Sequence, residues 1–192
     1  LINRRSRAKA PYVVLDDQAG AMLAIQHLYD LGHREIAYLA GPPGVETAEQ
    51  RRLGVVQRCQ ELGLALPEDR VIACGFGGEG VEAAVERILS SDPPTAIAAA
   101  SIVIAFAAAK ALQARGLAIP RDISLIGYHD TPLAEFVTPG ITTIEMPLTE
   151  LARHAMNNIL ARANGAPISN EVISHPAPRL VLRHSTAPPK RG

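Results

Sequence analysis

The segment HLYDLGHREIAYLAGP, residues 27–42, constrains the fold of this chain more than any other part of it. Leu28 and Leu31 complete the apolar face of a helix, and Gly32 provides the left-handed conformation that commonly ends helices. The apolar run Ile36–Ala40 follows and leads into a Gly-Pro turn. Such a run, apolar on both faces, is typical of a strand in a parallel sheet that helices cover on both sides.

The same order returns later in the chain, where a helix ends at Gly116, Pro120 interrupts, and DISLIGY forms the next strand. Helices and buried strands in alternation predict an α/β fold with a parallel sheet. Ligands of such sheets bind at the carboxyl ends of the strands. We expect strands at 12–15, 36–40, 71–74, 95–100, 124–126, 141–144, 172–173 and 180–182, and helices at 18–31, 47–62, 79–89, 102–115 and 147–163. Thr47 and Gln50 match a capping box at the start of the second helix.

The composition excludes several classes of protein. The 192 residues are 47% hydrophobic but only 4% aromatic, which indicates an aliphatic core. Nineteen basic residues balance nineteen acidic ones, so the chain has no net positive charge to bind the DNA backbone, and the basic clusters at residues 4–9 and 190–191 are interpreted as solvated tails. No signal peptide and no apolar run long enough to span a bilayer is present in the sequence. Cys59 and Cys74 have no metal-binding spacing and are expected to be buried, reduced thiols of a cytoplasmic protein.

Candidate sites for metals and cofactors are weak. The six histidines form no HExxH motif and no close pair, so we expect no metal site. Residues 75–80, GFGGEG, fit the GxGxxG pattern of a dinucleotide-binding turn between a strand and a helix. The next strand, however, ends at Ser101 and Ile102, without the acidic residue that binds the ribose. The interpretation as an ordinary glycine-rich turn is therefore favoured, and no cofactor is expected.

Three polar positions follow strands or lie near their carboxyl ends. His129 comes directly after the strand SLIGY, and Arg51 lies close to the loop 41–46 and within reach of a ligand above the sheet. Asp16 and Asp17 follow the first strand as a pair of carboxylates. No nucleophile with a recognisable partner accompanies them, so the residues favour a binding protein over an enzyme.

Several long motifs resemble one known family. GHREIAYLAGP, then RRLG at 51–54, IPRDISLIGYHDTPLAEFVTPGITTI and finally PRLVLRHST occur in the order and spacing of the effector-binding core of the LacI family of bacterial transcription regulators. The resemblance covers residues 12–186.

The resemblance implies a periplasmic-binding-protein-like fold, with two Rossmann-like subdomains that each have a parallel sheet and helices on both faces. The chain would cross three times between them. Residues 1–41 and 145–163 would form a partial amino-terminal subdomain, residues 42–144 and 164–186 a complete second subdomain, and residues 187–192 a tail. The helix-turn-helix of the family is expected to be absent from this chain.

The resemblance also assigns ligand positions. The family arginine of the RxxG segment matches Arg51, and neighbouring ligand contacts match Thr47 and the aromatic platform Phe76. Asp16 matches the acidic residue that ends a strand of the amino-terminal subdomain, and Ser101 stands at a family position that is usually polar.

Three departures from the family pattern bear on the effector. Ser101 and Ile102 stand where the family usually has a polar pair such as Asn-Asp. His129 replaces a usual aspartate, and Met146 replaces a usual polar residue. Loss of the carboxylate that binds sugar hydroxyls makes a neutral sugar less favoured. This loss favours a smaller, anionic or more apolar effector, or a pocket that binds no effector. Arg51 together with a protonated His129 would suit an acidic effector.

By this resemblance the chain is the effector-sensing and dimerisation domain of a cytoplasmic regulator, usually a repressor. A sugar or small organic acid would change operator affinity allosterically, and operator DNA would be bound only through the absent domain. The alternatives are a periplasmic solute-binding protein, a Rossmann-type enzyme using the glycine-rich loop, and a dimer module that binds no ligand.

Overall fold

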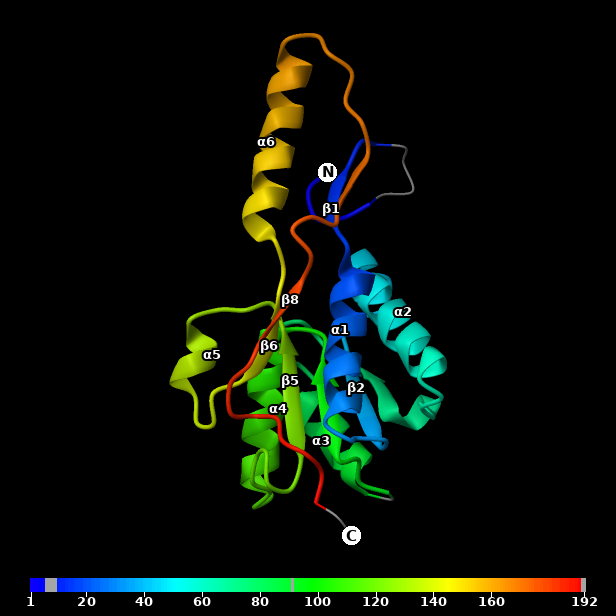
Figure 1. Cartoon of the computed structure of the whole chain (residues 1–192), viewed down its shortest axis with the longest axis vertical. Coiled ribbons are helices and arrows are strands. Elements are labelled where there is room, and N and C mark those ends of the chain that lie inside the picture. Colours follow the sequence, from blue (N-terminus) through cyan, green and yellow to red (C-terminus); the bar gives the residue numbers. More distant parts are fainter. Residues whose placement is uncertain (6–9, 91, 191–192) are drawn as a thin grey trace.

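The computed structural model describes residues 1–5, 10–90 and 92–190 and consists of a large and a small part (Figure 1). The large part contains the strands β2 (Ile36–Ala40), β3 (Val71–Ala73), β4 (Ala96–Ala99), β5 (Ser124–Tyr128), β6 (Thr142–Glu145) and β8 (Arg179–Val181). Its helices are α1 (Asp17–Asp30), α2 (Glu46–Glu61), α3 (Val81–Leu89), α4 (Ile102–Ala114) and the single turn α5 (Leu133–Phe136), with a 3-10 turn at Glu68–Arg70. The small part contains β1 (Val13–Leu15), β7 (Glu171–Ile173) and α6 (Leu148–Ala163).

The large sheet has the strand order β3-β2-β4-β5-β6-β8. All neighbouring strands are parallel except β8, which runs antiparallel to β6 at the edge of the sheet. After β2 the chain adds β3 on one side and then β4 on the other, so the strand order reverses between β2 and β4. In open α/β sheets this reversal opens a crevice at the carboxyl ends of the strands, where ligands bind.

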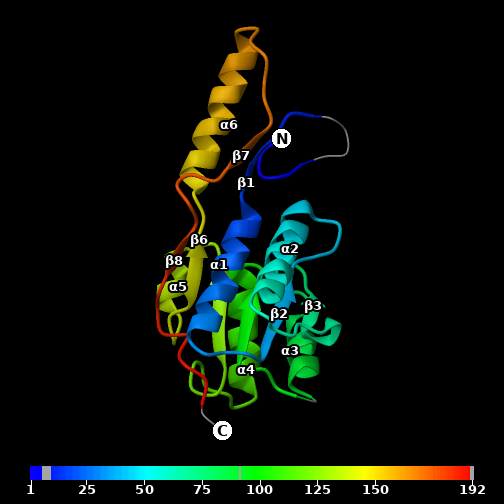
Figure 2. The same ribbon diagram turned by 45° about the vertical axis from the view of Figure 1, so that its right-hand side comes forward.

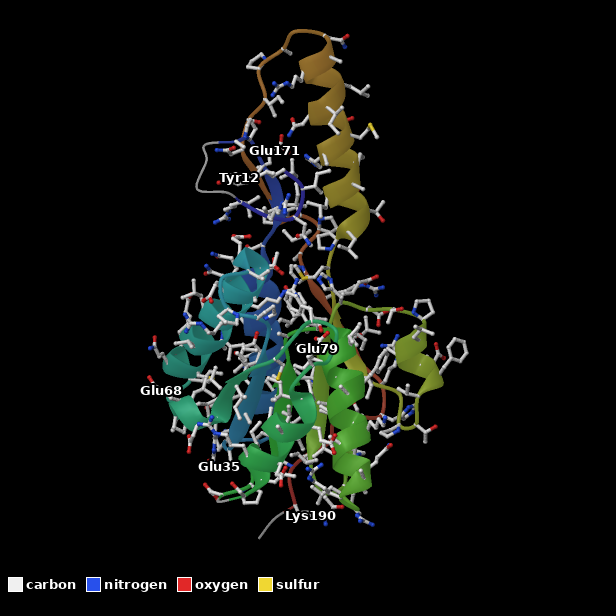
Figure 3. The ribbon with its side chains drawn as sticks, turned by 180° about the vertical axis from the view of Figure 1, so that it is seen from behind. Tyr12, Glu35, Glu68, Glu79, Glu171 and Lys190 are labelled. Atoms are coloured by element: carbon white, nitrogen blue, oxygen red, sulfur yellow. The ribbon has the colours of Figure 1, made fainter. Side chains whose placement is uncertain are left out.

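Helices cover both faces of this sheet. α1 packs closely against α2 on one face, and α3 packs against α4 on the other (Figures 1 and 3). The strands β2, β4 and β5 are buried along their whole length, as expected for strands with helices on both sides. Their side chains are mainly Ala, Ile and Leu, so the core is aliphatic as the composition predicts.

The small part contains a two-stranded parallel sheet, in which Val13 pairs with Glu171 and Leu15 with Ile173. Strand β1 of this sheet packs against α6. Three segments of the described chain join it to the large part: residue 16, residues 146–147 and residues 174–178 (Figure 2). Each leads directly from an element of one part to an element of the other. The two parts are therefore connected by three short links within the described chain.

The division of the chain differs from the one expected from the resemblance. Residues 17–41 belong with the large sheet, because β2 pairs with both β3 and β4 and α1 packs on α2. Residues 171–173 belong with the small part, because β7 pairs with β1. We therefore propose residues 17–145 and 179–190 as the large subdomain, with most of the remaining described residues in the small one.

Most of the predicted strands and helices are present to within two residues, but the predicted capping box is wrong. α2 begins at Glu46, its N-cap residue is Val45, and no side chain caps it. Thr47 therefore lies inside the first helical turn, where it is buried against the core. The irregular segment 131–139 contains α5, a helix too short for its periodicity to show in the sequence.

Candidate functional site

Arg51 is the centre of a buried polar cluster at the carboxyl ends of the strands. Its side chain lies on α2 and is only 3% exposed. Nε donates to Asp17 Oδ1 at 2.8 Å, and Nη1 donates to the carbonyl oxygen of Ala100 at 2.7 Å. Ala100 directly follows β4 and His129 directly follows β5, so the guanidinium lies at the carboxyl ends of these two neighbouring strands.

Asp17 is the counter-ion of Arg51. It is the first residue of α1, is 2% exposed, and has a carboxylate near the positive end of the helix dipole. The Tyr128 hydroxyl donates to Asp17 Oδ1 at 3.1 Å. Burial, and the nearby Asp17 carboxylate, raise the pKa of Tyr128 well above its ordinary value, so the hydroxyl remains a donor. The Arg51 guanidinium carbon also lies 4.2 Å from the centre of the Tyr128 ring, where cation–π attraction is favourable.

His129 completes the cluster. Its Nε2 lies 2.8 Å from Arg51 Nη2, and its backbone φ of 67° is left-handed, which is uncommon for a residue other than glycine. Burial, and secondarily the positive charge of Arg51, lower the pKa of His129 to about 3. The ring is therefore neutral at pH 7. The expectation of a protonated His129 that attracts an acid is wrong for this arrangement, because desolvation beside a cation disfavours the charged imidazole.

The other sequence-predicted site residues lie around this cluster in different roles. The Phe76 ring centre lies 5.8 Å from the Arg51 guanidinium carbon. Asp16 and Ser101 are the N-caps of α1 and α4, and their side chains accept from the backbone of Ala19 and Ile104.

Thr47 is buried in the first turn of α2, one turn before Arg51. The structure thus brings Arg51, His129 and Phe76 together. Asp16 and Ser101 instead cap the N-termini of α1 and α4.

Sequence reasoning did not choose Asp17 or Tyr128 as ligand positions, and it named Met146 only as a departure from the family pattern. Asp17 was one of two adjacent carboxylates, and only the fold shows that Asp16 caps the helix while Asp17 meets Arg51. Tyr128 was treated as part of a buried strand, although its position at the carboxyl end was a usable signal. The sulfur of Met146 lies 3.2 Å from the Tyr128 hydroxyl and extends the cluster to the β6–α6 link.

A cavity of about 430 Å³ lies at the junction of the two parts, and Met146 is the one residue of this cluster among those that line it. It is lined by Asp130, Glu145, Met146, Pro147, Leu148, Thr149, Glu150, Pro176, Ala177 and Arg179. Two of the three links between the parts therefore form its walls. A larger hollow of about 790 Å³ lies within the small part, between the first residues and α6, away from the buried polar cluster.

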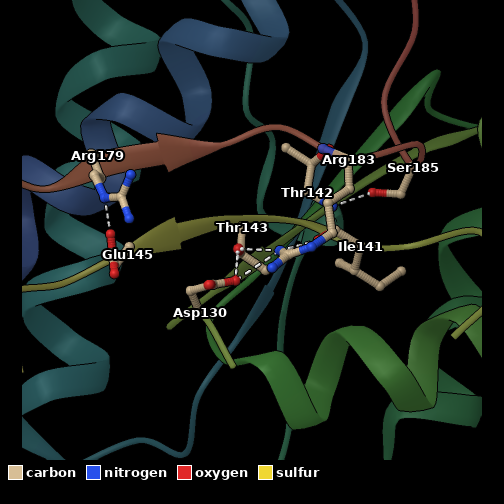
Figure 4. A network of polar contacts seen from close by, with 8 residues as sticks. All are labelled: Asp130, Ile141, Thr142, Thr143, Glu145, Arg179, Arg183 and Ser185. Atoms are coloured by element: carbon tan, nitrogen blue, oxygen red, sulfur yellow. Dashed lines mark hydrogen bonds and ion pairs between the residues drawn. The ribbon is translucent and has the colours of Figure 1, made fainter. Parts of the chain in front are cut away.

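A second ion pair joins Arg183 to Asp130 (Figure 4), and Asp130 is one of the residues that line the junction cavity. Arg183 donates to Asp130 Oδ1 at 2.7 Å and to the carbonyl oxygen of Ile141 at 3.0 Å. Thr143 donates to the same Asp130 oxygen at 2.6 Å. These bonds outweigh burial and lower the pKa of Asp130. Asp130 therefore anchors the β5 end to the edge of the sheet.

The glycine-rich loop contains a carboxylate. Added Cβ atoms at Gly75 and Gly77 would collide with the carboxylate of Glu79, which folds back over the loop. Figure 3 labels Glu79 at the end of the large part that faces the small part, with Glu35 and Lys190 at the opposite end. A negative side chain in this loop is the opposite of what a pyrophosphate requires. The interpretation as a structural turn fits this geometry.

Two other features concern reactive groups. Cys59 and Cys74 are free and buried, as the sequence predicts, and burial raises the pKa of the Cys59 thiol to about 11. Within the described ranges, no group of three or more His, Cys, Asp or Glu residues is arranged to hold a metal ion. Likewise, no described helix is both long and apolar enough to cross a membrane.

The fold and the site define a periplasmic binding protein-like domain, and the model of that domain family matches residues 25–186. A LacI family transcriptional regulator from Mycobacterium smegmatis has the same fold with a TM-score of 0.94 and 31% identity, over 98% of this chain and 70% of that one. The chain belongs to the LacI family.

Two further relatives bear on function. The HTH-type transcriptional regulator DegA of Bacillus subtilis is 36% identical over 177 residues, which are 92% of this chain and 52% of the relative. The transcriptional regulator CelR, solved as a cellobiose complex, matches 94% of this chain and 55% of its own, with a TM-score of 0.85 and 28% identity. This chain spans about half the length of the curated relatives it matches.

Proposed function

We propose that this chain is the effector-sensing domain of a DNA-binding transcription regulator that works in the cytoplasm, and that it is not an enzyme. The observation that carries the proposal is the contact between Arg51 and His129 at the carboxyl ends of the strands. Two residues chosen as ligand positions, 78 apart in the sequence, thus meet at the expected end of the sheet. A buried polar cluster beside a cavity is the usual form of a small-molecule site.

The proposed signal is a change in the relative orientation of the two parts. The cavity is walled by two of the links that connect them, so a molecule bound there contacts both parts and favours one arrangement. In the full-length regulator this preference would change operator affinity, usually as a repressor, through a coupling free energy of about 1–3 kcal/mol. Operator DNA would be bound by a different part of the protein, since this chain carries no net charge.

We further propose that the full-length protein is a homodimer, as the family resemblance implies. Met156, Ile159 and Leu160 of α6 are each more than half exposed, and such a stripe suits contact with another polypeptide. We expect the full-length regulator to sediment as a dimer in analytical ultracentrifugation. A full-length protein that sediments only as a monomer contradicts the dimer proposal.

A thermal-unfolding screen of sugars, nucleobases and small organic acids tests the sensing proposal. A ligand at 100 times its dissociation constant stabilises the folded chain by about 2.7 kcal/mol, which raises the midpoint by several degrees. We expect at least one such compound, and no comparable shift with NAD. Stabilisation by NAD alone supports the enzyme alternative, and no shift with any compound contradicts ligand sensing.

A further inference from the structure

The hydrogen atoms of His129 follow from its contact with Arg51. A guanidinium has only N–H donors, so the nitrogen that Arg51 faces, Nε2 of His129, must accept the hydrogen bond. In a neutral imidazole the other nitrogen then carries the hydrogen. Nδ1 is therefore a donor, and it is buried without a hydrogen-bond partner among the described residues.

The backbone of His129 adds an independent observation. Its φ of 67° places a large side chain in the left-handed region, which is costly away from glycine. The strained conformation directs the ring toward Arg51 at the end of β5. Buried donors without a partner are rare in folded proteins, and an effector that supplies an acceptor atom would satisfy this one.

The charge of the cluster is the second part of the argument. Arg51 and Asp17 form an ion pair of 2.8 Å in which both side chains are almost fully buried. The pair has no net charge, and the carboxylate holds the position on Nε that an acidic ligand would take. A second carboxylate entering here would lie beside Asp17 without a free cation, and like charges in a buried site repel strongly.

Resting on the proposed effector-sensing function, we propose that His129 and Asp17 set the specificity of this site. His129 Nδ1–H donates to an acceptor atom of an uncharged effector, while Asp17 cancels the charge on Arg51 that would otherwise attract an acid. The effector is then an uncharged molecule with a carbonyl, hydroxyl or ring-nitrogen acceptor. This assignment reverses the preference for acids that the sequence alone suggests.

Calorimetry with matched pairs tests the role of Asp17. The probes are acetamide and acetate, benzamide and benzoate, and methyl glucoside and glucuronate. In any pair that binds the wild-type chain, we expect the uncharged member to bind at least tenfold more tightly. Asp17→Asn, which leaves the charge of Arg51 uncancelled, should shift this ratio at least tenfold toward the acid.

Glu49→Gln is the matched control, since it removes a carboxylate from the neighbouring helix α2, where Glu49 pairs with the partly exposed Arg52. This control should keep the wild-type ratio. An acid preference in the wild-type chain, or an unchanged ratio in Asp17→Asn, overturns the inference but leaves ligand sensing intact. Failure of every compound in the thermal screen contradicts the sensing function itself.

Nitrogen-15 NMR of the wild-type chain tests the role of His129 without depending on the folding of a variant. At pH 7 the ring should show the neutral form with hydrogen on Nδ1, and this resonance should move when an uncharged probe binds. A hydrogen on Nε2, or a protonated ring at pH 7, overturns the assignment. An Nδ1 resonance that does not move when a probe binds also overturns the assignment.

Discussion

Arg51 and Asp17 are a buried ion pair, and the stability of such a pair depends on both partners being present. Removing one partner leaves an uncompensated charge in the interior, which costs much more than losing an exposed pair. Here the carboxylate also accepts from Tyr128, and the guanidinium also donates to Ala100. The site is therefore held in place before any ligand arrives.

Arg51→Met should lower the free energy of unfolding by about 3–5 kcal/mol, because it leaves Asp17 buried without a cation. Urea unfolding monitored by circular dichroism measures the change. Arg52→Met is the control, since Arg52 is partly exposed and pairs with Glu49, and it should cost less than about 1 kcal/mol. An equal decrease in the free energy of unfolding in the two variants would show that the buried ion pair stabilises the fold no more than the exposed one.

Stability should fall as the pH decreases from about 6.5 to about 5. Burial lowers the pKa of His27, His33 and His129 in the folded chain, whereas in the unfolded chain they titrate near 6.5. Below that pH the unfolded chain binds more protons, so the stability that the neutral rings contribute is progressively lost. His129 alone would contribute a slope of at most about 1.4 kcal/mol per pH unit.

Urea midpoints measured across this pH range check the expectation. His129→Asn should flatten the slope, and Asn tolerates the left-handed backbone at this position. The matched variant His184→Asn changes an exposed ring and should keep the wild-type slope. If His129→Asn keeps the wild-type dependence of stability on pH, His129 is not buried from solvent in the way that the structure shows.

At the scale of elements, the close contact of α1 with α2 positions the site. Gly54 lies one turn after Arg51 on the same face of α2, and a Cβ there would collide with the backbone of Gln18 in α1. The close approach of the two helices lets Arg51 reach Asp17 at the start of α1. The glycine of the RxxG segment is thus explained by packing, and its arginine by the ion pair.

Gly54→Ala should therefore destabilise the chain by about 1–3 kcal/mol through overpacking, although alanine is the better helix former. Gln60→Ala in the same helix is exposed and should be neutral or slightly stabilising. The thermal unfolding midpoints of the two variants test this prediction. A stabilised Gly54→Ala would mean that the helices separate at little cost.

The sequence predicted elements well where a single local pattern decides them. Ile36–Ala40 was placed to the residue because five buried apolar residues end in a Gly-Pro turn. The start of α2 was misplaced because Thr47 and Gln50 satisfy a capping pattern that the buried position of Thr47 overrides. Asp17 could not be chosen over Asp16, since only the direction in which α1 begins separates the two side chains.

At the scale of the whole molecule, the two parts meet through three short links, and two of these wall the junction cavity. The division that the resemblance implies differs from the strand pairing at residues 17–41, since the sequence shows that β2 is a buried strand but not to which sheet it belongs. That assignment depends on pairing between distant segments. The carboxyl-end positions of Arg51 and His129, in contrast, follow from strand direction alone.

The central claim is that a small molecule binds at the junction through His129. The most direct test is the affinity of the strongest compound from the thermal screen for wild-type, His129→Asn and His184→Asn chains, measured by calorimetry. The account predicts binding at least tenfold weaker in His129→Asn and unchanged in His184→Asn. Equal affinity for all three chains would contradict a sensing site at this position.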